Sequence, residues 1–138
     1  MEWTVSTEKE LDTIAETVAP LLLKGDVVAL YGSLGVGKTT FVRALVRRLT
    51  NVHVDVPSPT FTLLQTYVTP HFDLYHFDFY RLKTPEEAYE IGIEDAFSNG
   101  VSFIEWPDKI GNLLPKKHKS LSFEILANGQ RHICTDGF

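Results

Sequence analysis

The chain has 138 residues, of which 43% are hydrophobic, so we expect one domain over residues 1–138 with a core of its own. No run reaches the roughly 18 apolar residues of a membrane span, and the N-terminus lacks the basic and apolar regions of a signal peptide, which favours a cytoplasmic protein. The formal net charge of −5 makes strong binding of nucleic acid by the chain alone an unfavoured function. The single cysteine, Cys134, excludes an internal disulfide.

The N-terminal segment predicts a short edge strand followed by an amphipathic helix. Residues 2–5 form the strand, and Thr7 with Glu10 makes a capping-box pattern in which Thr7 is the N-cap. Pro20 and Gly25 suit the end of the helix. Its buried face is expected to consist of the apolar residues at helical spacing, which are Leu11, Ile14, Ala15, Val18 and Leu22.

The next segment has the order strand, glycine-rich loop, helix. Residues 27–31 are apolar without alternation, which is typical of a strand covered on both faces. The loop follows directly, and an apolar stripe at helical spacing then begins at Phe41 and ends at Leu49.

The rest of the chain mixes strands, loops and one helical stretch. In chain order we first expect a loop at 51–61, strands at 62–68 and 71–80, and a helix from Pro85 to about Phe97. A buried strand from Val101 to Ile104, which ends in Glu105, and an irregular segment at 106–118 are expected next. The last two strands, at 121–125 and 131–135, are expected to be joined by a turn at Asn128-Gly129. The mix predicts an α/β domain with the buried strands central and the hairpins peripheral.

Residues 32–39 match the G-x-x-x-x-G-K-[ST] pattern of a P-loop in full. The glycines let backbone N–H groups turn toward phosphate oxygens, and the helix that follows adds its positive dipole end. Lys38 is expected to reach the β- and γ-phosphates, Thr39 to ligate magnesium and Thr40 to contact an α-phosphate. An ordinary glycine-rich turn would lack the flanking buried strand and amphipathic helix. The predicted fold is a P-loop NTPase-like three-layer sandwich with a mixed central β-sheet, and the predicted nucleotide-binding residues are Gly32, Gly35, Val36, Gly37, Lys38, Thr39 and Thr40.

Magnesium also needs a carboxylate near the end of a neighbouring buried strand, and Glu105 occupies that position. Without the P-loop it would be interpreted as a surface glutamate at a strand end. Asp73 and Asp78 are further acidic candidates on one predicted strand. Since side chains alternate along a strand, only one of the two faces the nucleotide, and the periodicity leaves the choice open.

Three further residues have two interpretations each. Thr60 lies in the segment Ser58–Phe61, which either senses a γ-phosphate, as in P-loop switch proteins, or forms a proline-stiffened turn. Arg81 either stabilises phosphate charge or pairs with a neighbouring glutamate on the surface. Trp106 directly follows the predicted magnesium ligand and either leans on the site or belongs to the core.

Other chemistry has little support in the sequence. The five histidines show no H-x-x-x-H or similar spacing, so no zinc site is expected, and Cys134 is expected to pack in a hairpin rather than act as a nucleophile. An Asn-Lys-x-Asp guanine motif is absent, which weakens a GTPase interpretation. Two basic clusters are expected to be solvated surface or partner contacts, namely Arg43, Arg47 and Arg48, and Lys116, Lys117 and Lys119.

The chain resembles the TsaE (formerly YjeE) family of bacterial P-loop ATPases along nearly its whole length. The P-loop is generic, whereas the ordered set of motifs is specific. Asp78 matches the family's acidic position, and Asp73 is a local echo of it. The motifs that carry the resemblance are GSLGVGKTT at 32–40, Ser58-Pro59-Thr60-Phe61, HFDFYRL at 76–82, Ile91-Gly92-Ile93-Glu94 and Ile104-Glu105-Trp106-Pro107.

The resemblance implies an ATPase that uses ATP and Mg²⁺ and is required for threonylcarbamoyladenosine in tRNA. It would act with TsaB and TsaD to reset their complex between turnovers, and would meet tRNA only through that complex. Magnesium would be held by Thr39 and Glu105, while Thr7 and Arg131 would lie near the nucleotide. We expect Asp78 to position the attacking water. The full catalytic set implied is Lys38, Thr60, Asp78, Glu105 and Trp106.

Two other functions stay open at this point. One is a small-molecule kinase, although the segment 106–118 contains none of the arginines that a kinase lid usually carries. The other is a nucleotide-gated scaffold without catalysis, because no residue is an obvious activator of water.

Overall fold

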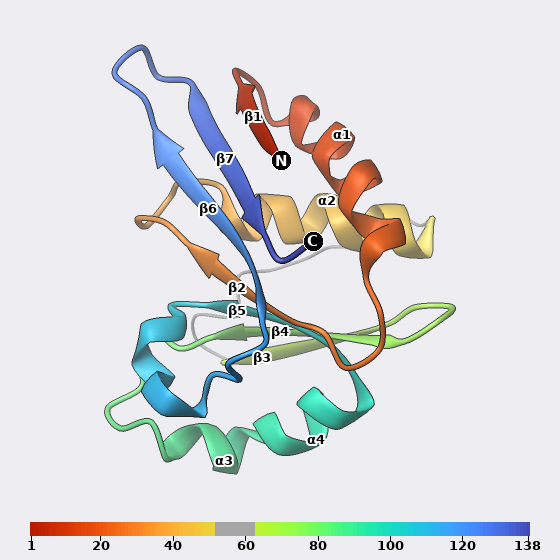
Figure 1. The fold of residues 1–138 in the computed structure, drawn as a ribbon, viewed down its shortest axis with the longest axis vertical. Coiled ribbons are helices and arrows are strands. Elements are labelled where there is room, and N and C mark those ends of the chain that lie inside the picture. Colours follow the sequence, from red (N-terminus) through yellow and green to blue (C-terminus); the bar gives the residue numbers. More distant parts are fainter. Residues whose placement is uncertain (52–62) are drawn as a thin grey trace.

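The computed structural model describes residues 1–51 and 63–138. Within them, seven strands form one mixed sheet in the order β1-β7-β6-β2-β5-β4-β3 (Figure 1). The segment Ser58–Phe61, with Thr60, lies outside the described residues. The strands are β1 (Glu2–Val5), β2 (Val27–Tyr31), β3 (Leu64–Val68), β4 (Asp73–Asp78), β5 (Gly100–Glu105), β6 (Lys119–Ile125) and β7 (Arg131–Asp136). The helices are α1 (Lys9–Val18), η1 (Ala19–Leu21), α2 (Lys38–Thr50), α3 (Glu87–Ile91), α4 (Ile93–Asn99) and η2 (Pro107–Leu113), where η marks a 3₁₀ helix.

Four parallel strands form the middle of the sheet. β2 pairs in parallel with β5 on one side and with β6 on the other, and β5 pairs in parallel with β4. The antiparallel pairs β1–β7, β6–β7 and β3–β4 lie toward the two edges. The prediction of buried central strands with peripheral hairpins is therefore confirmed. Because carboxyl ends of parallel strands meet at one edge, the residues that end β4 and β5 lie beside the loop that follows β2.

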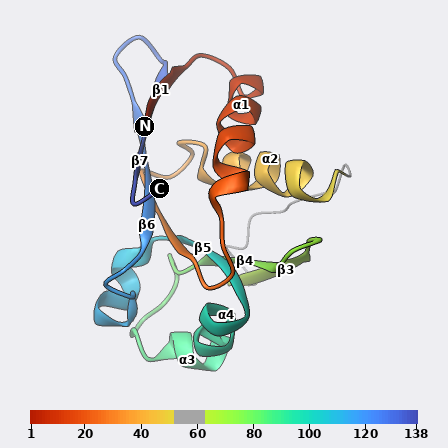
Figure 2. The same cartoon turned by 45° about the vertical axis from the view of Figure 1, so that its right-hand side comes forward.

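Helices cover both faces of this sheet and give the protein three layers (Figures 1 and 2). One apolar cluster fills the space beneath α1 and α2, and a second lies beneath α3 and α4. In β2, Val28 and Leu30 join the first cluster and Val27 joins the second. A strand buried on both faces has no polar side, which explains the lack of alternation in its sequence. The predicted α/β class and the three-layer P-loop NTPase-like arrangement are confirmed.

The start of α1 differs from its prediction. Glu8 is the N-cap residue, it has helical backbone angles, and no side chain caps the helix. The Thr7 hydroxyl donates to the Glu10 carboxylate at 3.4 Å instead of accepting from the first turn. An N-cap side chain reaches the first-turn N–H groups from extended backbone, a geometry that Glu8 does not adopt. The capping-box prediction with Thr7 as N-cap is therefore wrong.

The end of α1 also lies earlier than the sequence suggests. The α-helix stops at Val18, because Pro20 has no N–H to continue the ladder and stands in the first turn of η1. Gly25 is not the helix stop. It adopts a φ of +97° in the turn before β2, where its N–H donates to the Gly100 carbonyl at 2.7 Å.

Two later segments differ from their predictions, because one helix is divided in two and one segment expected to be irregular contains a 3₁₀ helix. The helix expected from Pro85 to Phe97 is two helices, because Gly92 takes a left-handed φ of +95° that ends α3 and begins α4. The segment expected to be irregular contains η2, which follows Trp106 at a φ of +59°. Among the helices of the described ranges, none is long and apolar enough to cross a membrane.

We predict that Gly100→Ala lowers the free energy of unfolding by about 3 kcal/mol. An added Cβ would meet the carbonyl oxygen of Asp73 and lie 2.7 Å from the Tyr75 ring, so β4 and β5 would have to separate. Gly92→Ala is the control, because its Cβ would meet open space and carry only the left-handed backbone cost of about 1–2 kcal/mol. Urea unfolding followed by circular dichroism measures both. Equal losses would contradict the steric argument.

Candidate functional site

The glycine-rich loop, Gly32–Thr39, joins the carboxyl end of β2 to α2. Gly37 is the N-cap of α2 with a φ of +113°, so the chain turns back sharply into the helix. At Gly32, a Cβ would lie 2.8 Å from Val36 Cγ1 and 2.9 Å from the Phe123 carbonyl oxygen. The loop is packed directly on β6 at this point. Glycine at position 32 is therefore required both by its φ of +145° and by lack of space.

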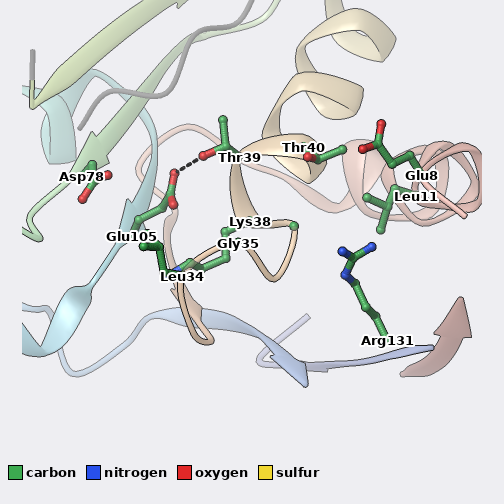
Figure 3. A pocket seen from close by; sticks show the side chains of 11 residues that line it. Glu8, Leu11, Leu34, Gly35, Lys38, Thr39, Thr40, Asp78, Glu105 and Arg131 are labelled. Atoms are coloured by element: carbon green, nitrogen blue, oxygen red, sulfur yellow. Dashed lines mark hydrogen bonds between the residues drawn. The ribbon is translucent and has the colours of Figure 1, made fainter. Parts of the chain in front are cut away.

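A cavity of about 340 Å³ opens beside this loop. Figure 3 shows that the side chains around it come from two directions. The carboxylates of β4 and β5 lie on one side, and residues of α1 and β7 on the other. The lining residues are Glu8, Leu11, Leu34, Gly35, Gly37, Lys38, Thr39, Thr40, Asp78, Glu105 and Arg131.

Lys38 is buried at the floor of the loop, with 4% of its surface exposed. Its Nζ donates to the Gly32 carbonyl at 2.7 Å and lies 4.0 Å from the centre of the Trp106 ring. Trp106 in turn packs against Tyr80, with ring centres 5.0 Å apart. Burial lowers the pKa of Lys38, and the negative charges of Glu105, Asp78 and Asp108 act in the opposite direction. The ammonium is thus held between a carbonyl, an aromatic face and carboxylates.

Glu105 is the centre of the hydrogen bonds at this edge of the sheet. Its Oε2 accepts from the Thr39 hydroxyl at 2.9 Å and from His76 Nε2–H at 2.6 Å. Burial acts to raise the pKa of Glu105, but the hydrogen bond and charge of His76, the Thr39 bond and Lys38 together hold that pKa below its usual range. A buried carboxylate therefore stays ionised beside a hydroxyl oxygen. Hard oxygen ligands of this kind suit Mg²⁺.

Asp78 lies on the same face of the sheet as Glu105. The two residues are register partners on the parallel strands β4 and β5, and Asp78 is 3% exposed. One carboxylate oxygen accepts from the Tyr80 N–H at 2.9 Å. Asp73 begins β4, so it lies at the opposite end of that strand and, by the alternation of side chains, on the other face. The structure therefore resolves the choice between the two aspartates in favour of Asp78 as the residue at the cavity.

Arg131 closes the cavity from β7. Its Cδ and Nε would lie 3.8 Å and 3.9 Å from a Cβ added at Gly37, so the guanidinium stem packs over the glycine-rich loop. Among the described residues, its buried Nε has no hydrogen-bond partner. An unsatisfied buried donor is costly unless a further group completes the site. An anion bound at the loop would supply such a group.

Some predicted residues lie elsewhere. Thr7 does not line the cavity, where Glu8 and Leu11 represent the start of α1 instead. Val36 is fully buried beneath the loop, and Trp106 reaches the cavity indirectly through Lys38.

The main site residue that the sequence reasoning missed is His76. It is completely buried, and within the described part of the chain its Nδ1 has no hydrogen-bond partner. The signal was available, because His76 shares a strand face with Asp78 by alternation. Its partner Glu105 comes from another strand, 29 positions later, and local spacing did not indicate that contact.

The basic residues of α2 lie close to acidic side chains near the start of the chain. Arg48 forms an ion pair of 3.7 Å with Glu16 of α1, and both side chains are largely exposed. Arg43 and Arg47 line a hollow that also contains Glu8 and Asp12. The surface between α1 and α2 is therefore mixed in charge, as expected for a solvated face or a partner contact.

A glycine-rich loop between a central parallel strand and a helix, facing carboxylates from the strands beside it, defines the class of proteins with a P-loop NTPase-like fold. Comparison with known proteins narrows this class. The family model described as threonylcarbamoyl adenosine biosynthesis protein TsaE matches residues 5–133. The chain therefore belongs to the TsaE family.

Individual relatives agree with this assignment. The tRNA threonylcarbamoyladenosine biosynthesis protein TsaE of Rickettsia bellii is 42% identical over 92% of this chain and 88% of its own length. The protein of the same name from Bacillus subtilis is 32% identical over 96% of this chain and 83% of its own length. The crystal structure of Bacillus subtilis YdiB superposes with a TM-score of 0.80 at 29% identity, covering 96% of this chain and 82% of that one.

We predict that His76→Phe raises the pKa of Glu105. The hydrogen bond and charge of His76 are the largest influences that oppose burial, so their removal leaves a buried carboxylate that favours its proton. Thr39→Val should raise the pKa less. Because the folded-state pKa is depressed in the native protein, its contribution to stability is present at neutral pH and is lost as the pH falls through that pKa. Carbon-13 NMR titration of labelled glutamate side chains measures the shift. An unchanged pKa in His76→Phe would refute the assigned cause.

Proposed function

We propose that the chain binds ATP with Mg²⁺ in the cavity beside the glycine-rich loop and hydrolyses it in the biosynthesis of threonylcarbamoyladenosine in tRNA. The observation that carries the proposal is the pairing of Thr39 and Glu105 at 2.9 Å beside the buried Lys38. The loop, the helix start and the ionised carboxylate together offer what a magnesium triphosphate requires.

The donor set at this edge of the sheet fits magnesium. The Thr39 hydroxyl and the Glu105 carboxylate would hold the ion, and His76 would keep that carboxylate oriented and ionised. When bound, the ion supplies positive charge that offsets the charge on the phosphate oxygens. Lys38 would move its ammonium from the Gly32 carbonyl to the β- and γ-phosphates.

Asp78 is the residue that we assign to the attacking water. It is the second carboxylate on the β4–β5 side of the cavity, adjacent in register to Glu105. Hydrolysis forms a bond from the water oxygen to the γ-phosphorus and breaks the bond from that phosphorus to the bridging oxygen, yielding ADP and phosphate. Asp78 would accept a hydrogen bond from the water and fix its direction of approach. Arg131 would donate to the phosphate chain from the β7 side.

We further propose that hydrolysis depends on partner proteins of the TsaB and TsaD type and resets their complex between turnovers. The cavity is accessible to solvent, since its lining residue Leu34 is 73% exposed, so a partner that covers it would exclude water and complete the catalytic arrangement. The net charge of −5 and the mixed surface of α1 and α2 suit a protein that meets tRNA only through such a complex.

Lys38→Ala is expected to reduce partner-stimulated ATP hydrolysis by about 10²- to 10³-fold, the cost typical of losing one preorganised donor to transition-state charge. Lys24→Ala, an exposed lysine in the turn before β2, is the matched control and should retain full activity. Phosphate release by the complete complex, with and without each variant, gives the comparison. Full activity of Lys38→Ala would remove the loop from catalysis. Tight ATP binding by the native chain with no hydrolysis in the complex would instead favour a nucleotide-gated scaffold.

Glu105→Gln is expected to abolish the gain in nucleotide affinity that magnesium provides, a loss of about 10- to 100-fold. The amide keeps the shape of the side chain but removes the charge that holds the ion. Glu90→Gln, an exposed position on α3, is the control. Calorimetric titration with ATP in magnesium and in EDTA measures the difference for each variant. A Glu105→Gln variant that still responds to magnesium as the native protein does would exclude Glu105 as a ligand.

A further inference from the structure

A second cluster of metal-binding side chains lies on the edge of the sheet formed by β1 and β7. Glu2 of β1 and Cys134 of β7 are register partners across an antiparallel pair. His132 lies two residues before Cys134, so both point to the same face of the strand. Arg131, which lines the nucleotide cavity, points to the opposite face. The cluster is therefore separated from the cavity by the sheet itself.

The three side chains converge closely. His132 Nε2 lies 3.7 Å from Glu2 Oε2, Cys134 Sγ lies 3.8 Å from Glu2 Oε1, and Cys134 Sγ lies 3.8 Å from His132 Nε2. Tetrahedral zinc, with bonds of about 2.3 Å to sulfur and about 2.0 Å to nitrogen or oxygen, places its ligand atoms about 3.3–3.6 Å apart. The observed separations are within a few tenths of an ångström of that arrangement. Small rotations of the three side chains would close the difference; Glu2 is exposed, and His132 and Cys134 are half-buried.

The ligand types indicate which ion fits. A thiolate, an imidazole and a carboxylate are all zinc ligands, whereas Mg²⁺ and Ca²⁺ prefer oxygen alone. We propose that Glu2, His132 and Cys134 form a three-ligand site for a divalent ion of the zinc class. Glu2 is 72% exposed in its side chain, so a fourth position is open to water. No part of this proposal depends on the nucleotide site.

The surroundings of the Cys134 thiol affect the pH range in which it can bind a metal ion. Burial raises the pKa of Cys134, as do the charge and hydrogen bond of Glu2 and the charge of Glu124, while the N-terminal amine acts to lower it. A thiol with a raised pKa is a poor nucleophile and a slow target for oxidants. A zinc ion would displace the proton, so binding should release a proton and strengthen as the pH rises.

The ion would join the two ends of the chain. Glu2 and Cys134 are 132 positions apart in sequence, and β1 is a four-residue edge strand held by β7. A metal bond between residues so far apart restricts the unfolded chain strongly. We therefore expect zinc to stabilise the folded protein and to hold β1 against the sheet.

The test uses the full chain with its own N-terminus and no added residues, stripped of metal, kept reduced with a non-thiol reductant, and free of nucleotide. Co²⁺ should give the absorption bands of a tetrahedral thiolate site, and competition with a chromophoric chelator should yield one tight Zn²⁺ site per chain. Cys134→Ser, His132→Gln and Glu2→Gln should each weaken Zn²⁺ binding by about tenfold or more. Cys134→Ser should also remove the sulfur-to-cobalt band.

Two controls separate this site from other carboxylates. Asp136→Asn alters the next outward residue of β7 and should leave Zn²⁺ binding unchanged, as should Glu105→Gln at the nucleotide cavity. Zinc should raise the unfolding temperature of the native protein and of both controls, but not that of Cys134→Ser. Binding that survives all three ligand substitutions, or that is lost equally in Glu105→Gln, would overturn the proposal.

Discussion

The arrangement of side chains at the carboxyl ends of the parallel strands depends on the Glu105 carboxylate. It comes from the central strand β5, and it joins two elements through a single oxygen, since Thr39 of α2 and His76 of β4 both donate to it. Burying such a charge would be unfavourable without these donors and without the Lys38 ammonium nearby. The same contacts that make the charge tolerable also fix the first turn of α2 against the sheet. Stability and ligand chemistry are therefore inseparable at this point.

The three layers explain how those contacts are held in place. Parallel strands β2, β5 and β4 end at one edge, so the loop, Glu105 and Asp78 arrive together without any local sequence relation among them. Phe41 of α2 packs on Phe103 of β5 and on Phe123 of β6, with ring centres 6.4 Å and 6.0 Å apart. The helix that carries Thr39 is thereby anchored to the two strands on either side of β2.

The fold and the loop could be predicted from the sequence because their signals are local. Strand β2, the glycine-rich loop and α2 are contiguous, and their burial pattern and glycines specify them directly. The choice between Asp73 and Asp78 could not be made by periodicity, since it depends on the register of β4 against β5. His76 was missed for the same reason, and the group of Glu2, His132 and Cys134 is formed across strands from opposite ends of the chain. The prediction for the start of α1 was wrong for a different reason: Glu8 adopts helical backbone angles, so the local capping pattern does not form.

The left-handed backbone at Trp106 links the packing of η2 to the surroundings of Lys38. In a regular strand, Trp106 would point away from the face that Glu105 occupies, yet its left-handed φ of +59° brings the ring over Lys38. Conformations of this kind cost a bulky residue about 1–2 kcal/mol and persist only when neighbours impose them. Here the next residue, Pro107, is buried and begins η2, whose Ile110 packs in the layer beneath α3 and α4. Because Trp106 directly precedes η2, a change in the packing of η2 would alter the contact between the Trp106 ring and the Lys38 ammonium at the glycine-rich loop.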